Sequence, residues 1–212
     1  MVIFFDVRFA VVIFAYPNLL TNIWQVARYR VDFGPKRLWL VFAVAGLVGT
    51  VFGSLLLIWL PPDTLLLILA LIVVGYVAFR LMRPDWVLER GFGTKLAGPI
   101  GLVAGVFYGA VALSAPISIT YLNAMRLPRP EFIATVSAFF LGMGLSQIPM
   151  LFGLGLLNST SHIIGLAGTA AMLASMPLGE AVARRFSEKT FDRLILLMLS
   201  LIAFRIFWTL SF

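Results

Sequence analysis

Long apolar segments separated by short polar connections make up almost the whole chain. Most of these segments are about 20 residues long, which is the length with which a helix crosses a bilayer. The pattern predicts helices over residues 8–28, 38–60, 64–81, 96–113, 116–126, 131–154, 162–183 and 191–208. No linker or low-complexity tract interrupts them, so residues 1–212 are expected to form one all-α, polytopic membrane domain.

The composition agrees with this fold class and limits the chemistry. Hydrophobic residues make up 61% of the chain and charged residues 12%, with a mean hydropathy of +1.03, whereas soluble domains carry about 25% charged residues. The absence of cysteine and the single histidine exclude disulfides and Cys- or His-rich metal sites. We therefore expect no metal and no cofactor. The sequence also contains neither a G-x-S-x-G nucleophile elbow nor a nucleotide-binding P-loop, which argues against a hydrolase and against ATP-driven transport.

The basic residues report membrane orientation rather than a nucleic-acid partner, although the pI is near 10.4. All but two of the 16 Lys and Arg residues lie in or beside four short connections. These connections follow the predicted helices 8–28, 64–81, 116–126 and 162–183, and we expect them on the cytoplasmic side of the cell (inner) membrane. All four connections can lie on that side only if helices 96–113 and 116–126 together enter and leave the membrane on the same side.

The stretch from Gly98 to Leu127 carries the clearest pattern in the chain. It opens as an apolar helix whose glycines recur every three or four residues, which leaves a strip of bare backbone along one face. It then breaks at Ser114-Ala115-Pro116 and resumes over residues 116–126, which reach only about 16 Å. Because lipid cannot satisfy freed backbone groups, such a break survives only inside protein or beside a wet cavity. The stretch therefore predicts a re-entrant hairpin, and Gly46, Gly49 and Gly53 predict a second close-packing face on helix 38–60.

The two halves of the chain also resemble each other. Each reads as a proline-interrupted helix, a small-residue helix and a plain apolar helix, but the equivalent loops carry their positive charge on opposite sides. This predicts two inverted-topology repeats, with 1–83 as the first and 96–212 as the second. The second repeat begins with the 96–126 hairpin and the first has no counterpart, so we expect the first repeat to be N-terminally incomplete.

Several short motifs, in this order, are similar to those of a known family. They are the run PNLLTNIWQVARYR, the glycines Gly101, Gly105 and Gly109 leading to Ala115-Pro116, and Tyr121-Leu122 followed by EFIAT at 131–135. With these motifs the chain resembles the sulfite exporter (TauE/SafE) permeases of the 4-toluene sulfonate uptake permease-like superfamily. The resemblance implies seven to nine helical segments in two repeats and transport of a small anion such as sulfite, a sulfonate or thiosulfate. The glycine-rich entry motif of the family's first half is missing.

Polar residues beside the predicted helix breaks are the candidate substrate ligands. Asn18, Asn22 and Gln25 share one face beyond Pro17, and Gln147 lies just before a second proline in the other repeat. Their amides can donate hydrogen bonds to a sulfite or sulfonate oxygen, or they can join helices to one another.

The predicted hairpin turn supplies further candidates, Ser114, Pro116 and Ser118. Pro116 would open a helix whose free N–H groups face an anion; the alternative is a tight turn in which the hydroxyls cap their own helix. We expect the substrate site between the repeats, at breaks at Pro17, Pro116 and Pro149. The expected partners are a small anionic substrate, the lipid bilayer and a possible second copy of the chain. A membrane scaffold or assembly protein, or a carrier of another small metabolite, stays an alternative.

Overall fold

Seven helices make up most of the chain that the computed structural model describes, which is residues 7–83, 86–157 and 159–183 with helical pieces between 196 and 206. They are α1 (Val7–Arg28), α2 (Lys36–Trp59), α3 (Pro62–Met82), α4 (Arg90–Val111), α5 (Ala115–Ala124), α6 (Arg129–Gly153) and α7 (Ser159–Ala183). Five of them, α1, α2, α3, α4 and α6, are long and apolar enough to cross a membrane. No strand occurs in this described part, so the all-α polytopic class is confirmed.

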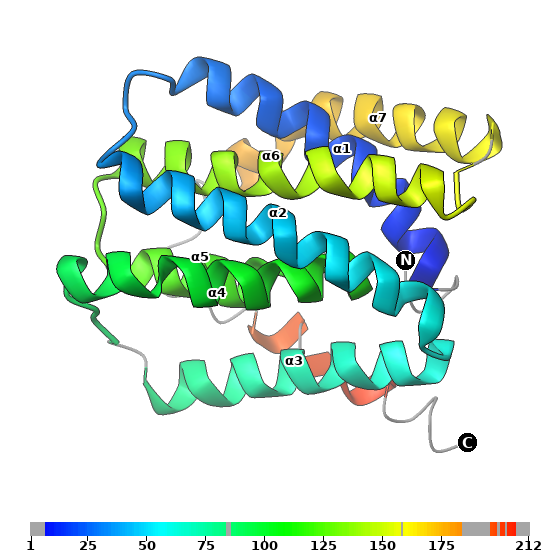
Figure 1. Ribbon diagram of the computed structural model, residues 1–212, viewed down its shortest axis with the longest axis horizontal. Helices are drawn as coiled ribbons and strands as arrows, with labels where there is room; N and C mark the ends of the chain where they lie inside the picture. Colours follow the sequence, from blue (N-terminus) through cyan, green and yellow to red (C-terminus); the bar gives the residue numbers. More distant parts are fainter. Residues whose placement is uncertain are drawn as a thin grey trace.

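The helices lie side by side with their axes roughly along one direction (Figure 1). Helix α2 is central and packs mainly against α4 on one side and α6 on the other. Helix α1 packs against α6 and α7, while α3 lies along the opposite edge with few neighbours (Figure 1). The arrangement therefore has a dense centre at α2, α4 and α6 and a loosely attached edge helix.

Two predicted helix breaks are absent. Helices α1 and α6 run without interruption through Pro17 and Pro149. A proline removes one backbone donor, but helices of 22 and 25 residues keep their remaining hydrogen bonds and continue. The prediction of breaks at these two prolines is therefore wrong, and the break between α4 and α5 is the one that the described helices contain.

The α4–α5 hairpin is confirmed, with an earlier start than expected. Helix α4 begins at Arg90 rather than at residue 96. The backbone turns at Ala112, which has a φ of 56°, and α5 runs back for 10 residues. The Leu88 N–H donates to the Ala124 carbonyl at 2.8 Å, and the Tyr121 hydroxyl donates to the Gly93 carbonyl at 2.7 Å. The hairpin therefore enters and leaves at the same end of the molecule.

Glycines let α2 and α4 approach until their backbones touch. A Cβ at Gly49 would overlap the Leu102 carbonyl, and one at Gly53 would overlap the Val106 carbonyl. The contact partner on α4 moves from Leu102 to Val106 as the glycine on α2 moves from Gly49 to Gly53, so the two helices run parallel. The opposite contacts place Gly101, Gly105 and Gly109 against the carbonyls of Phe42, Gly46 and Thr50. We call this interlocking set, with Gly49 and Gly53, the glycine seam.

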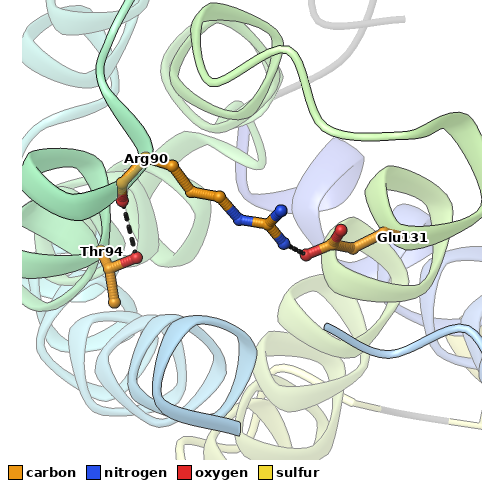
Figure 2. Close-up of polar contacts among 3 residues, drawn as sticks. All are labelled: Arg90, Thr94 and Glu131. Atoms are coloured by element: carbon orange, nitrogen blue, oxygen red, sulfur yellow. Dashed lines mark hydrogen bonds and ion pairs between the residues drawn. The ribbon is translucent and has the colours of Figure 1, made fainter. Parts of the chain in front are cut away.

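An ion pair joins the start of α4 to the start of α6 (Figure 2). The Arg90 guanidinium contacts the Glu131 carboxylate, while the Arg90 carbonyl accepts a hydrogen bond from the Thr94 hydroxyl at 2.8 Å. Glu131 is 9% exposed and lies against Gly34 in the α1–α2 loop. The pair therefore joins the entry of the hairpin to the entry of α6, with the α1–α2 loop packed over the carboxylate.

Replacing Glu131 by glutamine is expected to lower the free energy of unfolding by about 1 kcal/mol. The effect is small because the Arg90 side chain is 48% exposed and solvent screens the pair. A double-mutant cycle with Arg90→Gln, followed by thermal unfolding in detergent at low and high salt, measures it. A coupling that did not shrink with salt would contradict this account.

Candidate substrate site

The polar face of α1 faces α6. The Asn18 amide donates to the Phe140 carbonyl at 3.1 Å, and the Gln25 side-chain oxygen accepts a hydrogen bond from the Ser137 hydroxyl at 2.8 Å. The Asn22 amide donates to the Asn18 backbone carbonyl at 2.7 Å and to its side-chain oxygen at 3.2 Å. The first two bonds join the antiparallel helices α1 and α6, whereas the Asn22 bonds lie within α1. The Asn18 amide is oriented by its bonds to the Phe140 carbonyl and to the Asn22 amide. An asparagine amide has two donors and an acceptor with two lone pairs, so Asn18 keeps unused hydrogen-bonding capacity.

Gln147 on α6 is fully buried, and neither polar atom of its amide has a hydrogen-bond partner among the residues that the structure describes. It lies three residues beyond Gly144, where an added Cβ would be 3.2 Å from the Asn18 amide nitrogen. Residues three apart share a helix face, so Gln147 belongs to the surface of α6 that meets α1. A buried amide without partners is rare in a folded protein because its desolvation is uncompensated.

Tyr108 on α4 brings a third helix to this region. Its ring lies edge-on to Phe140 with the centroids 6.4 Å apart, and its hydroxyl lies beside the Asn18 side chain. The hydroxyl is buried without a hydrogen bond that meets ordinary geometric limits. Asn18 is therefore the common neighbour of Tyr108 and of the α6 surface that carries Gln147. Three helices, α1, α4 and α6, contribute polar side chains here.

At the hairpin turn, the buried hydroxyl of Ser114 also has no hydrogen-bond partner in the described part of the chain. The Ser114 carbonyl accepts hydrogen bonds from the Ser118 hydroxyl at 2.9 Å and from the Ser118 N–H at 2.9 Å. The Ser118 hydroxyl thus bonds back to its own helix, but neither hydroxyl caps the start of α5 as the alternative interpretation expected. Pro116 lies in the first turn of α5, as predicted.

In a comparison with protein-family models, residues 1–206 match the sulfite exporter TauE/SafE model. The chain belongs to the sulfite exporter TauE/SafE family. Searches of the curated proteins and of the solved structures find no match. The members of this family are membrane transporters of sulfur-containing anions rather than enzymes. The chain is therefore a multi-pass membrane protein of a transporter family.

The TauE/SafE chain brings together part of the predicted ligand set. Asn18 contacts α6 at Phe140, Asn22 is hydrogen-bonded to Asn18, and Gln25 lies farther along α1, paired with Ser137 of α6. Gln147 lies three residues beyond Gly144, the α6 residue beside the Asn18 amide. The hairpin residues Ser114, Pro116 and Ser118 form a separate group, and no contact recorded among the described residues joins them to the amides. The grouping of all seven into one site therefore stays a prediction.

Ser54 on α2 is a buried polar residue that the sequence analysis did not select. Its hydroxyl is fully buried without a partner, and its backbone nitrogen would lie 2.7 Å from a Cβ at Gly109, next to Tyr108. Its position directly after Gly53, beside the small-residue face of the helix, is the sequence feature that could have identified Ser54 as a candidate. Thr50 on the same face differs, because its hydroxyl donates to the Gly46 carbonyl at 2.8 Å.

Proposed function

We propose that this TauE/SafE protein is a secondary transporter of a small sulfur oxyanion: sulfite, thiosulfate or a sulfonate. The observation that carries the proposal is the unpartnered Gln147 amide, buried on the surface of α6 that also meets Asn18. Burying a polar side chain inside a membrane protein costs free energy. Polar groups that are buried there and have no structural partner are therefore typical of substrate pathways.

The proposed ligands are neutral hydrogen-bond donors. Gln147, Asn18 and Tyr108 together offer amide and hydroxyl protons, which suit the several acceptor oxygens of a sulfur oxyanion. Hydrogen bonds between neutral donors and an anion are worth about 1.5–3 kcal/mol each. A few such bonds hold an anion in a buried site and still allow it to leave, whereas a fixed arginine there would retain it.

The remaining predicted residues take supporting positions in this proposal. Asn22 orients the Asn18 side chain through its bond to the Asn18 side-chain oxygen, and Gln25 holds α1 to α6 through Ser137. Ser114 supplies a buried hydroxyl at the hairpin turn, where Pro116 and Ser118 shape the first turn of α5. Since the sequence contains no P-loop, the energy for the flux comes from a gradient or from a partner protein.

Uptake of radiolabelled sulfite and thiosulfate into proteoliposomes tests this function. Wild-type protein should give saturable flux. Asn22→Ala should lower the initial rate about tenfold, because it removes the bond to the Asn18 side-chain oxygen and one misaligned bond to an anion corresponds to about that factor.

Thr169→Val is the matched control for this assay. Thr169 is also buried, but its hydroxyl donates to the Gly165 carbonyl of its own helix at 2.8 Å. This variant should retain wild-type flux. Absence of flux for sulfite, thiosulfate and sulfonates with folded wild-type protein would overturn the proposed function.

A further inference from the structure

A large apolar cavity of about 560 Å³ lies between the edge helix α3 and the α4–α5 hairpin. Its volume falls within the roughly 300–1,000 Å³ of ligand pockets. The α3 side contributes Gly75, Tyr76 and Phe79, and the α5 side contributes Pro116 and Thr120. We call it the α3 cavity. It is distinct from the α1–α6 surface that carries Asn18 and Gln147.

A smaller, cationic pocket of about 150 Å³ adjoins the α3 cavity. Both are lined by Phe79, Trp86 and Thr120, so one opens beside the other. The smaller pocket adds three guanidinium groups, those of Arg80, Arg83 and Arg126. A third pocket of about 220 Å³ continues from Arg126 to Arg129.

Two of these guanidinium groups, those of Arg83 and Arg126, carry the argument. Neither Arg83 nor Arg126 has a carboxylate partner among the described residues. Both side chains are exposed. Two guanidinium groups that share one pocket repel each other, so an anion between them would stabilise the arrangement.

An aromatic pair separates the apolar and cationic spaces. The rings of Phe79 and Trp86 meet edge to face, with their centroids 5.2 Å apart. Tryptophan is enriched at the depth of the lipid headgroups, where its ring is apolar on one side and wet on the other. The order of an apolar cavity, an aromatic pair and an arginine cluster is the order of acyl chain, glycerol region and phosphate in a phospholipid.

We infer that the α3 cavity and its arginine cluster bind an anionic phospholipid, with the acyl chain in the cavity and the phosphate between Arg83 and Arg126. Basic pockets between membrane helices bind anionic headgroups on the cytoplasmic side. The connections after α3 and α5 are also those that the distribution of positive charge assigns to that side. The apolar cavity offers a sulfur oxyanion almost no hydrogen bonds, so the inference does not depend on the transported substrate.

Native mass spectrometry of the purified protein with phosphatidylglycerol or phosphatidylcholine of the same acyl chains tests the site. Wild-type protein should bind phosphatidylglycerol at least about tenfold more tightly. The double variant Arg83→Gln/Arg126→Gln should bring the two affinities together. Arg30→Gln/Arg37→Gln, which removes the same charge from the α1–α2 connection, should leave the preference unchanged.

A second variant tests the acyl-chain part of the site independently of charge. Gly75 lines the α3 cavity, and an added Cβ there meets no atom within 4 Å, so Gly75→Leu should fold while its side chain occupies the cavity. It should weaken phosphatidylglycerol binding about tenfold. If the double arginine variant fails to fold, this variant decides the question.

Three results would overturn the inference. They are equal binding of the two lipids by wild-type protein, full binding by Gly75→Leu, and displacement of the lipid by glycerol phosphate at a similar concentration, which would make the pocket a site for free phosphate. Sulfite flux is a separate readout, so failure of the lipid site and failure of the transport function are distinguishable.

Discussion

Gly105→Leu is expected to abolish folding, whereas Gly75→Leu leaves the protein folded. A Cβ at Gly105 would overlap the backbone of Gly46, and backbone cannot move aside as a flexible side chain can. Adding methylenes to a packed core costs about 1–3 kcal/mol where side chains can adjust. At the glycine seam two whole helices must separate, so the expected loss of unfolding free energy exceeds 3 kcal/mol by this scale.

Thermal unfolding in detergent, read by the light scattering and size-exclusion profile of each variant, distinguishes the two glycines. Gly75 is the control because an added Cβ there meets no atom within 4 Å. Gly105→Ala is the intermediate variant. It should lower the midpoint of thermal unfolding clearly, but by less than Gly105→Leu does. A monodisperse Gly105→Leu protein with an unchanged midpoint would show that α2 and α4 do not touch at this position.

Gln147→Leu is expected to lower transport about tenfold or more and, at the same time, to make the protein more stable. Leucine has a similar volume and no polar atoms, so it removes a buried amide whose two polar atoms lack partners. Leaving a buried group unsatisfied costs about 1–3 kcal/mol, and the variant should recover part of this. The substrate would lose a donor to one of its oxygens, which lowers flux by about tenfold or more.

The opposite directions of the two effects make this prediction specific. A residue that only held helices together would lose stability and activity in parallel. Ser146→Ala is the control on the same helix, because the Ser146 hydroxyl is buried but donates to the Met143 carbonyl at 2.9 Å. Its flux should match wild type. Retained flux in Gln147→Leu, measured in the same proteoliposomes, would remove Gln147 from the site.

Features that depend on the spacing of nearby residues could be predicted from the sequence. The glycines of helices α2 and α4 recur every three or four residues, and each set does meet a neighbouring backbone. The break at Ser114 and Pro116 also produced the predicted hairpin. Gly98 is an exception, since a Cβ there would make only an ordinary contact with Val41 at 3.7 Å. Periodicity identifies a close-packing face but does not decide which glycines on it are required.

Features that depend on partners elsewhere in the chain could not be predicted. The sequence contains two glycine faces, but nothing local pairs them with each other as parallel neighbours. Pro17 and Pro149 have the same local chemistry as Pro116, yet only Pro116 lies at an interruption. The difference between Gln25, which accepts a hydrogen bond from Ser137, and Gln147, which has no partner, also depends on the facing helix.

The glycine seam has a consequence for how such a protein opens alternately to the two sides of a membrane. Backbones that touch along several turns cannot slide or hinge past one another, so α2 and α4 should move as one rigid body. Relative motion then belongs to the boundaries held by side chains, between α1 and α6 and around the sparsely packed α3. A substrate that occupied the α1–α6 surface would lie at such a boundary rather than inside the rigid unit.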